Sequence, residues 1–75
     1  MAKSIVTVQS NKGSPIKGKR VVLIFKDGQT DPVFTNSAGE AVIDHRTVGS
    51  AEVHVAGKKR GTFRAPGTYP VTLDD

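Results

Sequence analysis

Residues typical of turns interrupt this sequence so often that no segment is expected to form a helix of ordinary length. Glycine occurs eight times and proline four times in 75 residues. Turn clusters recur at roughly the 8 to 12 residue spacing of a sandwich or barrel. No window of about ten residues places apolar side chains at the i, i+3, i+4 and i+7 positions of an amphipathic helix. Because the intervening runs are short and rich in Val and Thr, the sequence predicts an all-β fold.

About seven short strands account for these runs, which is the number that a two-sheet, Greek-key, Ig-like sandwich needs. Asp27-Gly28 suits a tight hairpin turn, so the next strand is expected to return along the one before it. Asp31-Pro32 removes one backbone donor from that returning strand and predicts an edge or a bulge there. The expected strands span residues 4–9, 19–26, 29–35, 40–44, 50–56, 59–64 and 68–73.

Alternation along these strands predicts the core, because successive side chains of a strand point to opposite faces. The expected core residues are Val6, Val8, Val21, Leu23, Phe25, Phe34, Ala41, Ile43, Val53, Val55, Phe63, Tyr69, Val71 and Leu73. The opposite face of the strand at 19–26 is also apolar, at Val22 and Ile24. Two interpretations of that strip remain open: a central strand covered by a loop, or an exposed surface that docks a partner.

Length and composition predict one domain, residues 1–75, without disulfides. A chain of this size keeps much of its surface in water, and it contains no cysteine. The amino-terminal segment lacks the apolar stretch of a secretory signal, since Thr7 and Gln9 interrupt it. The longest apolar run, residues 21–25, is far shorter than a membrane-spanning helix. We therefore expect no membrane span and a cytoplasmic protein, or an extracytoplasmic one if the chain is excised from a longer parent.

The charge balance favours anionic partners. Eleven Lys and Arg residues against seven Asp and Glu residues give a net charge of +4. One cluster flanks an aromatic residue, Phe63, and comprises Lys58, Lys59, Arg60 and Arg64. Basic side chains with interleaved rings can bind single-stranded nucleic acid. Alternatively, they form a solvated hairpin that protects a sheet edge from aggregation.

Residue patterns for catalysis or metal binding are weak. No Gly-x-Ser-x-Gly elbow and no glycine-rich loop opening a helix occur. Glu52 and His54 lie two residues apart on one face of the strand at 50–56, but two ligands do not make a metal site. A chain this short has little room for both a core and a deep pocket. We expect no enzyme activity, no metal, no cofactor and no small-molecule substrate.

The turn and strand motifs together resemble a known family. Gly-Ser-Pro-Ile-Lys-Gly-Lys-Arg-Val-Val-Leu at 13–23, Thr-Asn-Ser-Ala-Gly-Glu-Ala at 35–41 and Val-Gly-Ser-Ala-Glu-Val-His-Val at 48–55 occur in order. This arrangement resembles the carboxypeptidase regulatory-like domain and its transthyretin-like (prealbumin-like) relatives, including collagen-adhesin B-type repeats. The resemblance implies a transthyretin-like sandwich. Ala51 departs from the aromatic residue of the family pattern, and the chain begins at its own Met, whereas most members are modules of longer proteins.

The resemblance and the residues together predict a non-catalytic module that binds or positions a protein partner. The candidate surfaces are a sheet edge, the strip at Val22 and Ile24, and the loops at one end. Pairing through strand edges would give a homo-oligomer. The alternative is a small nucleic-acid or anionic-surface binding domain, which would use Lys58, Lys59, Arg60 and Arg64.

Overall fold

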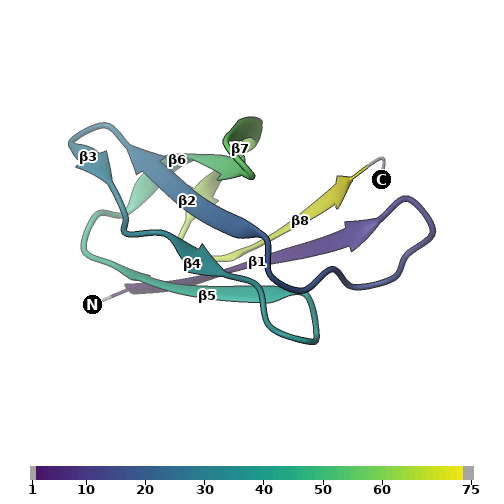
Figure 1. Ribbon diagram of the computed structural model, residues 1–75. Coiled ribbons are helices and arrows are strands. Elements are labelled where there is room, and N and C mark those ends of the chain that lie inside the picture. Colours follow the sequence, from purple (N-terminus) through teal and green to yellow (C-terminus); the bar gives the residue numbers. More distant parts are fainter. Residues whose placement is uncertain (1, 74–75) are drawn as a thin grey trace.

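Residues 2–73 are described by the computed structural model, and within them the chain forms strands and no helix (Figure 1). The described residues therefore contain no helix that spans a membrane. The strands are β1 (Ala2–Ser10), β2 (Arg20–Phe25), β3 (Gly28–Gln29), β4 (Val33–Phe34), β5 (Glu40–His45), β6 (Gly49–Val55), β7 (Lys58–Ala65) and β8 (Thr68–Leu73).

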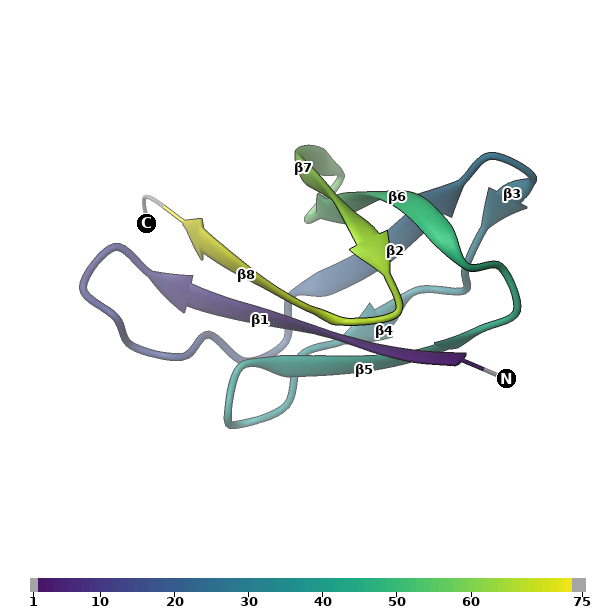
Figure 2. The same ribbon diagram turned by 180° about the vertical axis from the view of Figure 1, so that it is seen from behind.

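Two sheets face each other, which confirms the predicted β-sandwich (Figures 1 and 2). The smaller sheet has the order β5-β1-β8, with β1 antiparallel to β5 and parallel to β8. The larger sheet has the order β3-β2-β6-β7, and β4 also pairs with β2. The chain passes from one sheet to the other after β1, β4, β5 and β7, so half of the strand pairs (β1–β5, β1–β8 and β2–β6) join strands that are distant in sequence.

One expected strand is broken in two, which raises the number of strands to eight. The strand predicted at 29–35 appears as β3 and β4, each only two residues long. Between them, Thr30 keeps the chain against β2: its hydroxyl accepts a hydrogen bond from the Leu23 amide at 3.1 Å, and its amide donates to the Leu23 carbonyl at 2.9 Å. The interruption then includes Pro32, which has no amide proton to donate. The sequence predicted the position of this irregularity correctly, but it did not predict its length.

The core lies between the sheets and contains most of the expected residues. Phe63 and Tyr69 are only partly buried, and their ring centroids lie 5.4 Å apart. Phe34 is a wrong prediction, because its residue surface is 60% exposed. The register pairs Val33 with Val21 and Phe34 with Arg20, so Val33 is the β4 residue that points inward. The buried core residues are Val6, Val8, Val21, Leu23, Phe25, Ala41, Ile43, Ala51, Val53, Val55, Ala65, Val71 and Leu73.

Thr35 attaches the long β1–β2 loop to the larger sheet. Its hydroxyl donates to the Ile16 carbonyl at 2.7 Å and accepts from the Lys19 amide at 2.9 Å. Its backbone carbonyl accepts from the Gly18 amide at 2.9 Å. Because the Thr35 side chain is buried, these bonds satisfy loop groups that would otherwise lose water without a partner.

Asn36 and Gly39 form the turn that leads into β5. The Asn36 side-chain oxygen accepts from the amides of Ala38 and Glu40 at 2.9 and 3.0 Å, as in an Asx turn. Gly39 has a φ of +76°, which favours glycine. Its Cα also packs closely on β1 and on the β1–β2 loop: a Cβ at this position would lie 2.5 Å from the Val8 carbonyl oxygen and 2.9 Å from the Pro15 Cβ. The Thr-Asn-x-x-Gly motif is thus explained by hydrogen bonding and by close packing.

Candidate functional site

The face of the larger sheet that points away from the smaller sheet, here called the outer face, carries both predicted docking residues. Val21 and Leu23 point into the core, so Val22 and Ile24 point outward. The register adds charged and aromatic residues from four strands to this face. They are Arg20 of β2, Phe34 of β4, Glu52 and His54 of β6, and Lys59 and Arg64 of β7.

The apolar part of the outer face differs from the one that the sequence suggested. Val22 is only 5% exposed, because β2 lies between β4 and β6 and side chains on both neighbours flank it. Val22 is therefore not an exposed docking residue, which was the other interpretation of this strip. Ile24 is half-buried, and Phe34 is largely exposed. Phe34 and Ile24, rather than Val22 and Ile24, are thus the apolar side chains that this face offers.

The predicted basic cluster does not form one surface. Lys59 is paired with His54 and Arg64 with Ser50, which places both cations on the outer face. Lys58 is paired with Val55, whose side chain points inward, so Lys58 lies on the other face of the sheet. Arg60 has no partner in the register, because the β6–β7 ladder shifts at this point.

Glu52 and His54 contact each other across the outer face. His54 Nε2 donates to Glu52 Oε1 at 3.2 Å, and Lys59 Nζ lies 4.0 Å from Glu52 Oε2. Among residues 2–73, no three His, Cys, Asp or Glu side chains are grouped so that they can hold a metal ion. The Glu52–His54 contact therefore lies within β6, and the Glu52–Lys59 contact is the one that joins β6 to β7.

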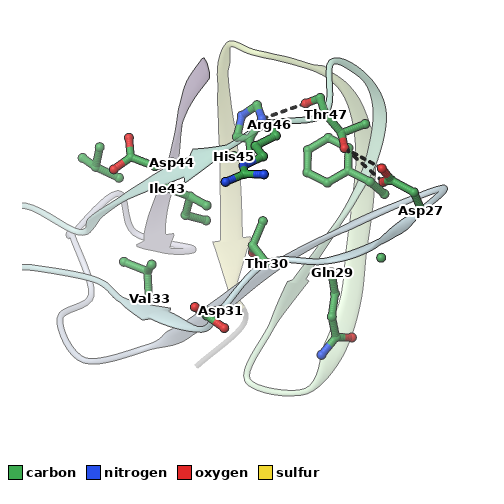
Figure 3. Close-up of a pocket in the computed structure, with 13 residues that line it drawn as sticks. Asp27, Gln29, Thr30, Asp31, Val33, Ile43, Asp44, His45, Arg46 and Thr47 are labelled. Atoms are coloured by element: carbon green, nitrogen blue, oxygen red, sulfur yellow. Dashed lines mark hydrogen bonds between the residues drawn. The ribbon is translucent and has the colours of Figure 1, made fainter. Parts of the chain in front are cut away.

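A cleft of about 540 Å³ opens between β5 and the segment that carries β3 and β4 (Figure 3). Asp27, Asp31 and Asp44 line it together with a single arginine, Arg46. The Thr47 hydroxyl lies 3.0 Å from both carboxylate oxygens of Asp27, which ties the β2–β3 turn to the β5–β6 connection. The cleft is acidic, whereas the outer face is basic.

A buried serine and histidine meet behind this cleft, a pairing that sequence reasoning missed. His45 Nδ1 lies 2.8 Å from the Thr47 carbonyl oxygen, which can only accept, so Nδ1 carries the proton. His45 Nε2 then accepts a hydrogen bond from the Ser4 hydroxyl at 2.7 Å. The order of groups is that of a nucleophile, a base and an orienting acceptor. However, Ser4 is 0% exposed, so a substrate cannot reach its Oγ.

The Ser4–His45 contact is therefore expected to contribute to stability. Ser4→Ala leaves Nε2 of a buried imidazole without a donor and should lower the free energy of unfolding by about 1–3 kcal/mol. Urea denaturation measures the change. Adding His45→Leu to Ser4→Ala removes the unpaired acceptor, so the double variant should be destabilised by less than the sum of the single ones. Strict additivity would contradict the coupling.

No sequence signal identified this pair, because its members are 41 positions apart and meet only through the β1–β5 ladder. Only a weak sequence signal indicated that Phe34 is exposed. In the segment Val33-Phe34-Thr35, alternation is compatible with Phe34 facing the core or with its two neighbours facing the core.

Comparison with known proteins gives no match to this chain among protein-family models, curated proteins or solved structures.

Proposed function

We propose that this protein is a non-catalytic β-sandwich module that binds a protein partner through its outer face, with Phe34 as the central contact. The observation that carries the proposal is the 60% exposure of Phe34 on a sheet face, directly opposite Arg20 in the register. Aromatic and arginine side chains dominate the binding energy of protein interfaces. A phenylalanine side chain has few rotatable bonds, so it also loses little conformational freedom on binding.

Charge indicates which kind of partner fits. Arg20, Lys59 and Arg64 all lie on the outer face, and Glu52 is engaged with His54. A partner surface with an apolar depression surrounded by carboxylates would complement this arrangement, accelerating association and excluding basic competitors. The resemblance of the turn motifs to accessory domains of the transthyretin-like type supports a binding role of this kind.

Nucleic-acid binding is the second candidate, and the same exposed ring favours it. A base can stack on Phe34 while Arg20 contacts a phosphate. Proteins that bind single strands through stacking use several exposed rings for successive bases. Phe63 and Tyr69, in contrast, pack against the core. A protein partner therefore fits the outer face better.

Photocrosslinking can identify the partner. A benzoylphenylalanine replaces Phe34 in one version of the chain and Val48 in the other; Val48, in the β5–β6 connection, is 63% exposed and serves as the control. We expect an adduct with a specific protein from position 34 and not from position 48. Equal labelling from both positions, or adducts with nucleic acid only, would contradict a protein-binding outer face.

Affinity measurements with the purified partner test the role of Phe34. Phe34→Ser should weaken binding at least about tenfold, as expected for an aromatic contact at the centre of an interface. Unfolding stability should change by no more than about 0.5 kcal/mol, because the residue is exposed. Val48→Ser should leave both quantities unchanged. A loss of binding that is equal in the two variants would argue against the proposal.

A further inference from the structure

Two of the sandwich's edges are protected against pairing with another strand, and two are not. β8 carries Pro70, which removes one backbone donor. β3 and β4 are only two residues long each, too short for a stable ladder. β5 and β7 are longer, and each pairs with another strand on one side only within the described chain, although Asn36 bonds the outward backbone groups of Glu40 at the start of β5. These two open edges are the places where a further strand can add.

The open edge of β5 is acidic. The Val8 amide bonds to the Gly39 carbonyl, and alternation along the ladder then directs the backbone groups of Val42 and Asp44 away from β1. Glu40 and Asp44 are the charged residues of β5 besides the buried His45. The acidic cleft with Asp31 adjoins this edge (Figure 3). A strand that pairs with this edge would therefore lie beside carboxylates.

The open edge of β7 is basic. The strand contains no acidic residue, and its four cations are Lys58, Lys59, Arg60 and Arg64. All four are exposed, and Lys59 also lies 4.0 Å from Glu52 of the neighbouring strand. In Figure 2, β7 and β8 diverge from the turn that joins them, so the end of β7 that carries Lys58 is distant from β8.

We propose that β7 of one copy adds to the β5 edge of a second copy. Like charges oppose β5–β5 and β7–β7 pairing, which are the two symmetric alternatives. The β7–β5 contact places cations against Asp31 and Asp44 and gives the backbone groups of Val42 and Asp44 partners. Such a contact is heterologous, so each added copy leaves one β5 edge and one β7 edge open. The product is a short, reversible head-to-tail chain.

This inference goes beyond the proposed function, because it depends on backbone edges rather than on Phe34. Charge attraction at these exposed positions is screened by salt, so association should be strong at about 20 mM salt and weak at about 500 mM. Sedimentation velocity on the unmodified chain measures it. We expect the average mass to rise above 8.0 kDa with protein concentration at low salt only. A monomer under all conditions would overturn the proposal.

Charge-reversal variants test which edges meet. Asp31→Lys with Asp44→Lys, and Lys58→Glu with Arg60→Glu, should each leave a monomer at low salt. In a mixture of the two variants, the basic β7 of the aspartate variant can pair with the acidic β5 of the β7 variant, so association should return. If the mixture stays monomeric, the pairing is wrong.

A matched control separates the edges from net charge. Lys12→Glu with Lys17→Glu changes the charge as much as Lys58→Glu with Arg60→Glu, but both lysines lie exposed in the β1–β2 loop. This variant should associate more than the β7 variant; equal loss would refute a specific contact. Amide exchange at Val42 and Asp44 should also slow in the associated state. Because Phe34 is untouched, the outcome is independent of the outer-face experiment.

Discussion

Leu23→Ala is expected to lower the free energy of unfolding by about 3–4 kcal/mol, a large effect for a single truncation in a chain of this size. Leu23 is 0% exposed and is one of the largest fully buried side chains, together with Ile43 and Leu73. It lies on β2, between β3 and β6 in the larger sheet, so the surrounding strands are held on both sides and cannot collapse into the cavity. Denaturant unfolding followed by circular dichroism measures the loss.

Ile24→Ala is the matched control, because Ile24 is the next residue and points to the outer face, where it is half-buried. Its truncation removes similar atoms but leaves no enclosed cavity, so a loss of about 1 kcal/mol is expected. A loss at Ile24 that equals or exceeds the loss at Leu23 would mean that the faces of β2 are assigned wrongly. A domain of this size has a total stability of only about 4–11 kcal/mol, so the Leu23 variant is expected to be partly unfolded near physiological temperature.

Gly39→Ala is expected to cost about 3 kcal/mol, although it adds a single methyl group. One part is backbone strain, since φ is +76° and a left-handed conformation costs a residue with a Cβ about 1–2 kcal/mol. The other part is overpacking. The new Cβ would lie 2.5 Å from the Val8 carbonyl oxygen and 2.9 Å from the Pro15 Cβ, and the backbone must move to relieve these contacts. Thermal and urea unfolding measure the sum of these two contributions to the free energy of unfolding.

Gly57→Ala separates the two parts. Gly57, in the β6–β7 turn, has a φ of +83°, but nothing lies within 4 Å of the position that a Cβ would occupy. This variant should therefore lose only the strain of about 1–2 kcal/mol. If Gly39→Ala and Gly57→Ala lower the free energy of unfolding equally, the close packing around Gly39 does not contribute to stability. The turn motif is then explained by backbone conformation alone.

These variants also separate the stability of the sandwich from its proposed binding surface. Leu23 and Gly39 lie in the core and beneath a loop, whereas Phe34, Lys58 and Arg60 are exposed. Loss of binding with unchanged stability is therefore expected only from substitutions of the exposed residues.

Much of the fold was predictable from local pattern. Alternation placed Val53 and Val55 in the core, and Pro32 marked the break in the strand predicted at 29–35. Asn36 and Gly39 marked a turn that the structure confirms. Each of these depends on interactions between residues close in sequence, or on the period of two that any strand imposes.

The candidate surfaces were less predictable, because they depend on register between strands that are distant in sequence. The β2–β4 register exposes Phe34, which alternation alone had placed in the core. The irregularity between β6 and β7 places Lys59, and not Lys58, on the same face as Arg64, and it leaves Arg60 unpaired. Neither the β2–β4 register nor the irregularity between β6 and β7 can be recognised from the local pattern of apolar and polar residues.

Sequence by itself determined that this protein is an all-β sandwich, where most of its turns lie and which faces of the longer strands are buried, because turn chemistry and side-chain alternation are local properties of a chain. Only the tertiary structure decided strand order, and with it the buried Ser4–His45 pair, the exposed Phe34 and the two open edges of opposite charge. The physical reason is that a one-residue change in pairing moves a side chain from one face of a sheet to the other, and only the complete set of strand contacts selects the register.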